Sequence, residues 1–162
     1  MPDQREDEQW ISLADLATEE QRLTFSRFDN SHAWELGKHM VQAAEAVQSP
    51  IVVHIRRGGQ VLFHAALAGS STDNHDWVKR KGRLVTRFGH SSLYMGQLCR
   101  EQSTTLEERF FLSMQEFSPF GGAFPIRVKD VGVVGYVGVS GLPQLEDHRF
   151  VTDSIAWHLR VD

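Results

Sequence analysis

Hydrophobic residues that recur every three or four positions predict five helices along this chain. The segments with this spacing are 9–17, 31–48, 73–88, 92–101 and 143–160. The first has acidic residues on its other face, and Thr18 to Gln21 fits a capping box at which we expect it to break or restart. Asp29 to Ser31 signals the start of the second helix, and Thr104 to Glu108 a further helical turn.

Short runs of alternating or β-branched apolar residues predict five strands. These strands are 23–28, 51–57, 60–66, 124–129 and 131–139. Gly58 and Gly59 join the second and third as a hairpin, because tight primed turns need positive φ angles. Hairpins in place of regular βαβ alternation favour an α+β fold with a five-stranded antiparallel sheet flanked by helices. At 162 residues we expect one domain over 1–162, with an acidic N-terminal helix at about 5–20.

The hairpin also predicts where two histidines lie. With Gly58 and Gly59 as a two-residue loop, His54 pairs with Phe63 and His64 pairs with Val53. Alternation along the strands then places His54 and His64 on opposite faces of the sheet. We therefore expect them to share neither a metal ion nor a catalytic role within one subunit, and we interpret each as a hydrogen-bonded histidine of the sheet.

Glycines at every third position mark the last strand and the turn after it. They are Gly132, Gly135, Gly138 and Gly141. Glycines with this spacing face opposite sides of a strand in succession, which indicates a close approach to both faces. Either helices pack closely over each face, which we favour, or one face holds a slot for a ligand. The G-x-G-x-x-G fingerprint of dinucleotide binding is absent.

Charge is distributed unevenly along the chain. Residues 1–20 carry a formal charge of −6 within a total of −4, so the remainder carries +2. That small excess lacks the strong basic character typical of nucleic-acid binding, and we predict no nucleic-acid partner. The acidic segment has an apolar helical face, so we expect it to dock on its own or a neighbouring subunit.

A row of basic residues follows the 73–88 helix. Charged residues recur at helical spacing as Asp76, Arg80, Arg83 and Arg87, with Lys79 and Lys81 beside them. The row ends at His90, Ser91 and Ser92, where N–H groups at the start of the next helix are suited to bind an anion. The alternatives are a solvated face or a surface for salt bridges, with the acidic N-terminal helix as one partner.

Composition excludes several classes of protein. A single cysteine, Cys99, forms neither an intrachain disulfide nor a zinc finger, and we interpret it as a core residue. The N-terminus lacks a secretory signal and no apolar run reaches the ~18–20 residues of a membrane span, so we predict cytoplasmic localisation and no membrane partner. Nucleophile-elbow, H-E-x-x-H and Walker A motifs are absent, so we predict no catalytic residue and no metal ligand. Asp147 and His148 are neighbours on the last helix and do not face each other as a dyad; we expect His148 to be partly buried and hydrogen-bonded.

Two glycine-rich motifs carry a resemblance to a known family. They are Gly121-Gly122-Ala123-Phe124-Pro125-Ile126 and Gly135-Tyr136-Val137-Gly138-Val139-Ser140-Gly141, followed by a helix. They resemble the heme-degrading-domain family with its GlcG-like and HbpS-like members. Further motifs, among them Ile55-Arg56-Arg57-Gly58-Gly59 and Arg87-Phe88-Gly89-His90-Ser91-Ser92, are similar to an uncharacterised short cytosolic branch of it. The resemblance covers about 20–160 and implies a profilin-like fold and homo-oligomers, as dimers or rings of dimers; some members bind heme.

We therefore predict an oligomeric binding or adaptor domain rather than an enzyme, with an unknown ligand that is a small anion in our first hypothesis. The residues expected to bind it supply charge and backbone donors; they are Arg80, Lys81, Arg87, His90, Ser91, Ser92, Gly121 and Gly122. Two alternatives stay open. Heme or another tetrapyrrole binds with His90 or His64 as axial ligand, or His90 acts as acid or base in a small-molecule enzyme.

Overall fold

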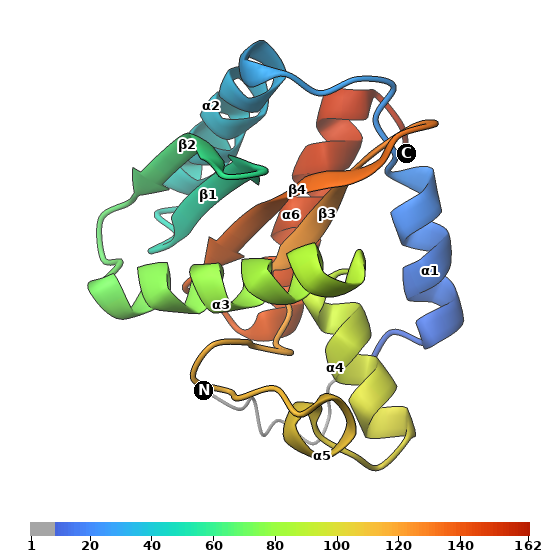
Figure 1. Cartoon of the computed structure of the whole chain (residues 1–162). Coiled ribbons are helices and arrows are strands. Elements are labelled where there is room, and N and C mark those ends of the chain that lie inside the picture. Colours follow the sequence, from blue (N-terminus) through green and yellow to red (C-terminus); the bar gives the residue numbers. More distant parts are fainter. Residues whose placement is uncertain (1–8) are drawn as a thin grey trace.

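A four-stranded antiparallel sheet lies between two layers of helices in the computed structural model, which describes residues 9–162 (Figure 1). The strands are β1 (Val52–Arg57), β2 (Gln60–Ala66), β3 (Ala123–Val128) and β4 (Gly132–Ser140), in the order β2-β1-β4-β3. Helices α2 (Asn30–Ala46) and α6 (Gln144–Leu159) pack on one face, and α3 (Thr72–Phe88) crosses the other. The α+β fold and its antiparallel sheet are as predicted. The sheet has four strands, however, and not the five that we predicted.

Three shorter helices complete the fold at the lower end and along the β3 edge in Figure 1. They are α1 (Leu13–Arg22), α4 (Ser92–Glu101) and α5 (Leu106–Phe110). The start of α2 is as expected: Asp29 caps this helix by accepting hydrogen bonds from the backbone N–H groups of Ser31 and His32, at 2.9 and 3.1 Å.

The predicted strand over 23–28 is wrong. Its only sheet contact is a single parallel bridge between Phe25 and Val128, at the end of β3. The reason is that α1 continues to Arg22, and the hydroxyl of Thr24 bonds back to the carbonyl of Gln21 at 2.8 Å. The N–H of Leu23 also still bonds to the Glu19 carbonyl of α1, so only residues 25–28 remain before the cap of α2. The apolar residues Leu23, Phe25 and Phe28 are buried without forming a ladder.

The first helix is also displaced from its prediction. It begins at Leu13, where Ser12 caps it, and runs through the expected break at Thr18 to Gln21. The Thr18 hydroxyl bonds to the carbonyl of Ala14 at 3.0 Å and so stays within the helix. The part of the predicted acidic helix over 5–8 lies outside the described residues.

The predicted register of the β1–β2 hairpin holds only beside the turn. Arg57 pairs with Gln60 and Arg56 with Val61, but a β-bulge after Ile55 shifts the pairing, so that His54 lies opposite His64. Both side chains are therefore on the same face, contrary to our prediction, and their Nδ1 atoms are 2.9 Å apart. One extra residue is enough for this reversal, because side chains alternate with a period of two.

The strand glycines allow close packing of the protein against itself. A Cβ atom on Gly138 would lie 2.7 Å from Val78 of α3, and one on Gly135 would lie 1.9 Å from the Arg56 carbonyl oxygen of β1. On α3, Gly82 meets the ring of Tyr136 in the same way. The contact at Gly138 fits a helix packed closely over one face, whereas Gly135 is approached by the neighbouring strand β1 and not by a helix. Neither position leaves a slot for a ligand.

Apolar side chains of β1, β3 and β4 fill the layer against α2 and α6, where Val53, Ile55, Phe124 and Val137 are buried. The opposite face carries His54, Tyr136 and Ser140 beneath α3. Cys99 is buried in a smaller cluster near α4, as predicted. None of the helices in the described part of the chain is long and apolar enough to cross a membrane.

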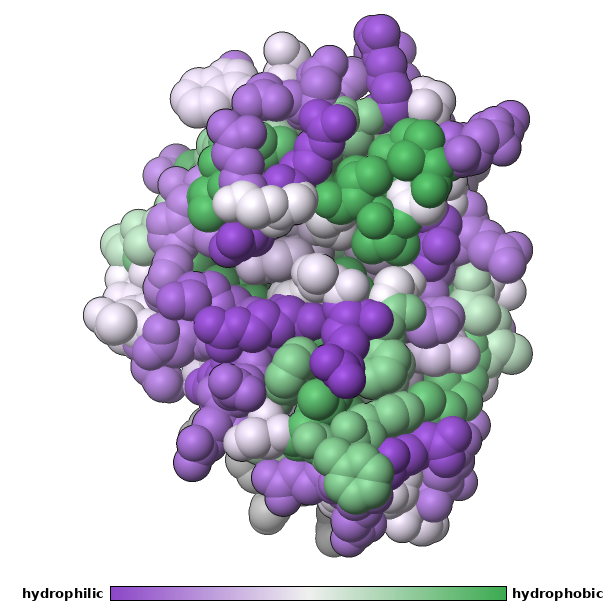
Figure 2. Space-filling model, in the orientation of Figure 1, coloured by the Kyte–Doolittle hydropathy of each residue, from purple (hydrophilic) through white to green (hydrophobic). Residues whose placement is uncertain are grey.

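Hydrophilic side chains gather along α3 on the face shown in Figure 2, with hydrophobic side chains above and below this band. Arg83 and Arg87 of α3 are exposed, and residues of α3 line both of the cavities described below.

Candidate functional site

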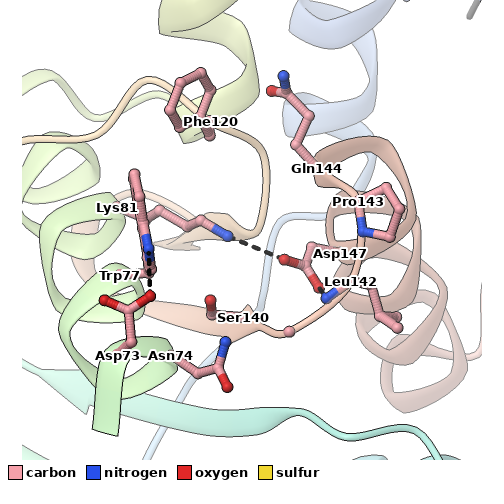
Figure 3. A pocket seen from close by; sticks show the side chains of 11 residues that line it. Asp73, Asn74, Trp77, Lys81, Phe120, Ser140, Leu142, Pro143, Gln144 and Asp147 are labelled. Atoms are coloured by element: carbon pink, nitrogen blue, oxygen red, sulfur yellow. Dashed lines mark hydrogen bonds and ion pairs between the residues drawn. The ribbon is translucent and has the colours of Figure 1, made fainter. Parts of the chain in front are cut away.

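A cavity of about 390 Å³ lies between α3, the end of β4 and the start of α6 (Figure 3). Its lining combines two aromatic rings with charged and amide side chains; the residues are Asp73, Asn74, Trp77, Lys81, Phe120, Ser140, Gly141, Leu142, Pro143, Gln144 and Asp147. We call it the Lys81–Asp147 pocket. Its size and its few convergent polar groups are typical of sites for small molecules.

Side chains on one side of α3 form one wall of this pocket. Asp73, Trp77 and Lys81 are spaced by four residues and therefore lie on one side of the helix. The Trp77 indole N–H donates to the Asp73 carboxylate at 3.1 Å, which holds the ring against the cavity opposite Phe120.

A buried ion pair forms the floor of the pocket. The Lys81 ammonium lies 3.0 Å from Asp147 Oδ2, and the two side chains are 5% and 1% exposed. Lys81 also donates to the carbonyl of Val139 at 3.3 Å, and Asp147 Oδ1 accepts from the backbone N–H of Leu142 at 3.1 Å. The sequence separates the two charged residues by 66 positions, and only the packing of α6 against α3 and β4 brings them together.

Burial favours the neutral form of both partners. It lowers the pKa of Lys81, against the attraction of Asp147, and it raises the pKa of Asp147 to about 6, against the attraction of Lys81 and the Leu142 N–H. A carboxyl group with this pKa changes its charge in mildly acidic solution. A pocket of this kind can therefore exchange a proton when a charged ligand enters.

Two adjacent glycines let one loop approach the ion pair. Gly122 has φ of 136°, and a Cβ atom on it would lie 2.5 Å from the Val139 carbonyl oxygen and 2.7 Å from the Lys81 ammonium nitrogen. The N–H of Gly121 donates to the Gln144 side-chain oxygen at 3.0 Å. The Gly121–Gly122 loop thus closes the pocket from behind, and larger residues would displace the Lys81 side chain.

The residues predicted to bind a ligand fall into three groups. Lys81 lines the pocket, whereas Gly121 and Gly122 lie behind its lining, next to Gln144 and Lys81 respectively. Ser92 supports their loop by accepting from the Ala123 N–H at 3.1 Å. Arg80 lies beside the pocket with its guanidinium 3.9 Å from the Trp77 ring centre. Arg87 lines a second cavity on the other side of α3.

His90 and Ser91 form the third group, away from both cavities. A Glu20 oxygen lies 2.8 Å from His90 Nδ1, and the other accepts from the Ser91 N–H at 2.7 Å. The anion that we expected at the start of α4 is therefore this buried carboxylate of α1, with the His90 ring stacked on Tyr94.

The same helix, α1, meets α4 and α6 and makes no ion pair with the arginines of α3 within residues 9–162. Besides Glu20, its Glu19 accepts a bond of 2.6 Å from Nε2 of His148, which is 1% exposed. The expected docking of the acidic helix is thus found on its own chain, and His148 is hydrogen-bonded as predicted and fully buried.

Three histidines gather where α3 crosses the sheet: His54 of β1, His64 of β2 and His75 of α3. His54 and His64 are bonded through their Nδ1 atoms, and the ring of His75 lies 4.8 Å from that of His64. Burial lowers the pKa of His54 to about 4, and its Nε2 has no partner among the described residues. Even so, no group of three or more histidine, cysteine or carboxylate side chains in that part of the chain is arranged to hold a metal ion.

The pocket contains residues that sequence reasoning missed, above all Asp147. One signal was available: Lys81 shares the apolar side of its helix with Leu84 and Phe88, and a buried lysine needs an opposite charge. The sequence contains 21 acidic residues, and nothing in it selects Asp147 from the others.

The chain is similar to known proteins in both sequence and structure. The family model for the haem degrading protein HbpS-like family matches residues 28–156. A UPF0303 protein of Streptomyces coelicolor is 46% identical over 144 residues, covering 89% of this chain and 91% of the relative. A UPF0303 protein of Serratia proteamaculans is 42% identical and covers 91% of each chain.

Among solved structures, the Ybr137w protein superposes with a TM-score of 0.85 at 32% identity, covering 93% of this chain and 90% of the other. HbpS and a PduOC–heme complex superpose with TM-scores of 0.65 and 0.66, at 18% and 17% identity. These two comparisons cover 82% and 80% of this chain and 90% and 93% of the other, and at such identities they show a shared fold.

Proposed function

This chain belongs to the haem degrading protein HbpS-like family, and from that premise we propose that it binds a small organic anion in the Lys81–Asp147 pocket. The observation that carries the proposal is the ion pair at the floor of the cavity. Burying two charged groups costs desolvation free energy, which a core that only stabilises the fold could avoid with apolar side chains. Well-packed hydrophobic residues in place of a buried ion pair leave a protein equally stable or more stable. Charged groups with displaced pKa values in a cavity are typical of functional sites.

The unused donors of the pocket define the chemistry of the ligand. The Lys81 ammonium has three N–H groups, of which two are engaged by Val139 and Asp147. The Gln144 side-chain oxygen accepts from Gly121, so its amide N–H groups are the ones available to a ligand. Together with the walls formed by Trp77 and Phe120, these donors suit a carboxylate attached to a flat or apolar body.

Asp147 makes the proposed binding depend on pH. When Asp147 is ionised, it competes with an anionic ligand for Lys81; when it is protonated, it leaves Lys81 to the ligand. Since the pKa of Asp147 is raised to about 6, affinity for a carboxylate should increase as the pH falls through this value.

Calorimetric titration with benzoate and succinate at pH 5.5 and pH 7.5 tests the proposal. We expect benzoate to bind more tightly at the lower pH. Asp147→Asn should bind it more tightly at pH 7.5 and with little pH dependence, and Lys81→Met should not bind it. Lys38→Met, which removes an exposed lysine of α2, is the matched control. Absence of binding by both probes, or equal losses in Lys81→Met and Lys38→Met, would contradict the proposal.

Heme is the second candidate, and the residues of the pocket do not fit its iron. The lining has no histidine, cysteine or methionine, and the space beside Gly135 and Gly138 is filled by Arg56 and Val78. Outside the pocket, His64 favours this candidate, because His54 engages one ring nitrogen while the side chain stays exposed. Titration of heme into the wild type, His64→Ala and His90→Ala, followed by the Soret band of the heme, tests this candidate. If the wild type does not shift the Soret band, the heme candidate is wrong.

We also propose that the chain forms homo-oligomers. Large apolar side chains are exposed on several elements: Trp34, Phe111, Val131 and Trp157 are 59%, 89%, 71% and 47% exposed. Such residues in one chain are suited to contacts between copies. Native mass spectrometry at micromolar concentration checks this, and a spectrum with monomer alone would rule it out.

A further inference from the structure

A second cavity, of about 540 Å³, lies on the other side of α3 from the Lys81–Asp147 pocket. Its lining is basic and aromatic; the residues are Arg56, Gly58, Lys79, Arg83, Thr86, Arg87, Phe117 and Tyr136. We propose that this cavity, the arginine pocket, binds a phosphorylated small molecule through its phosphate groups.

Two elements converge to make the arginine pocket. Lys79, Arg83 and Arg87 are spaced by four residues and so follow one side of α3, while Arg56 reaches the same cavity from β1. Hydrophilic side chains gather along α3 in Figure 2, and Arg83 and Arg87 of this helix are exposed. Chain segments that are distant in sequence therefore concentrate positive charge at one place.

The positive charge is not balanced within the described chain. No carboxylate lines the cavity, and none of its four cationic side chains takes part in an ion pair with another of residues 9–162. Cations at close range repel one another and raise the local concentration of anions. A multivalent anion would remove this repulsion, which a neutral or cationic ligand would not.

Two of the arginines are already oriented. Arg56 donates to the carbonyl groups of Gly58 and Gly59 in the hairpin turn, at 3.0 and 3.3 Å, and Arg83 donates to the Glu116 carbonyl at 3.3 Å. Each keeps further N–H groups for a ligand. Because backbone acceptors hold the guanidinium groups, less side-chain freedom is lost when an anion binds.

The chemistry of these donors favours phosphate over a single carboxylate. Guanidinium forks match the oxygens of phosphate, and several of them can share its two or more charges. Phe117 and the buried Tyr136 form an apolar wall beside them, which suits an organic body attached to the phosphate. Burial raises the pKa of Tyr136, so its hydroxyl keeps the proton that it can donate.

Isothermal titration with inorganic pyrophosphate, AMP and adenosine at constant ionic strength tests this proposal. We expect pyrophosphate and AMP to bind and adenosine not to bind. In the double variant Arg83→Ala/Arg87→Ala, the affinity for pyrophosphate should fall by about tenfold or more, because charge-assisted hydrogen bonds are lost. Arg149→Ala removes an exposed arginine of α6 that lines neither cavity and should bind as the wild type does.

Three results would overturn the proposal: no binding of either phosphate probe at millimolar concentration, equal weakening by Arg149→Ala, or equally tight binding of citrate. The test is independent of the Lys81–Asp147 pocket, because Asp147→Asn should change benzoate binding and leave pyrophosphate binding unchanged. Loss of pyrophosphate binding in Asp147→Asn, with none in Arg83→Ala/Arg87→Ala, would place the anion in the other pocket and also contradict the proposal.

Discussion

The two sides of α3 differ in how the positive charge of their basic residues is balanced. On one side, the ammonium of Lys81 is 5% exposed and is neutralised by Asp147. On the other side, Lys79, Arg83 and Arg87 face a cavity without any carboxylate in its lining. Residues of one helix, two positions apart, thus lie in an apolar interior and at a charged surface.

The difference shows how environment decides the role of a basic residue. A buried charge must be paired, so Lys81 contributes to stability only together with Asp147. Exposed arginines need no partner for folding, so their arrangement can serve a ligand at little cost to the fold. Variants that act on one side of α3 should therefore differ sharply from variants on the other.

The largest expected effect is that of Lys81→Met at neutral pH. It leaves Asp147 without its cation in the interior, where the carboxyl must either stay charged or take up a proton, and we expect the free energy of unfolding to fall by roughly 3–5 kcal/mol. Urea denaturation followed by circular dichroism measures it. Replacing both partners, in Lys81→Met/Asp147→Leu, should recover most of this loss; a double variant as unstable as the single one would show that the pair has another structural role.

Gly122→Ala should have the next largest effect, because the new Cβ atom adds a strained backbone conformation to contacts with Val139 and Lys81. A loss of about 1–3 kcal/mol is expected from thermal or urea unfolding. Gly59→Ala is the control, since a Cβ atom there meets nothing within 4 Å. Equal losses in the two variants would mean that the crowding around Lys81 is unimportant.

The ionisation of Asp147 should give a smaller effect that depends on pH. Its pKa is raised from 3.8 to about 6 on folding, so the folded protein holds the proton more tightly than the unfolded chain does. This stabilises the fold below about pH 4, and the contribution is lost as the pH rises towards 6, by at most about 1.4 kcal/mol per pH unit.

Stability curves of the wild type and Asp147→Asn between pH 4 and pH 7 isolate this contribution. The variant should lack it, so the difference between the two proteins should change with pH over this range. Parallel curves would mean that Asp147 has an ordinary pKa in the folded protein.

The smallest effect on stability is expected on the other side of α3. Arg83→Ala/Arg87→Ala removes two exposed side chains and relieves repulsion, so the free energy of unfolding should change by no more than about 0.5 kcal/mol in either direction. The same urea denaturation measures it. A loss of the size seen in Lys81→Met would mean that the two sides of α3 are not different in kind.

The helices and hairpins were predictable from periodicity, and the errors had local causes. The strand predicted over 23–28 has the right alternation, but α1 extends to Arg22 and leaves it only one bridge to β3. The His54–His64 contact was not predicted, because the register set by the turn does not continue past the bulge at Ile55. In both cases the pattern of side chains was real, and a backbone feature decided where they lie.

The candidate site was predictable only in pieces. Of the residues expected to bind a ligand, Lys81 lines the first cavity, and Gly121 and Gly122 only pack behind its lining residues. Arg87 belongs to another cavity, and His90 and Ser91 are engaged by Glu20. Whether these residues bind a ligand stays a prediction, which the titrations above address.

The sequence by itself determined the features that depend on neighbouring residues: the helical spacing of the α3 arginines, the capping of α2 by Asp29, and the hairpin turn at Gly58 and Gly59. Backbone geometry repeats over a few residues, so these patterns can be read directly. The tertiary structure alone decided the pairings of Lys81 with Asp147 and of Glu20 with His90, 66 and 70 residues apart. Many acids could satisfy a buried cation, and the partner is selected by which elements pack together.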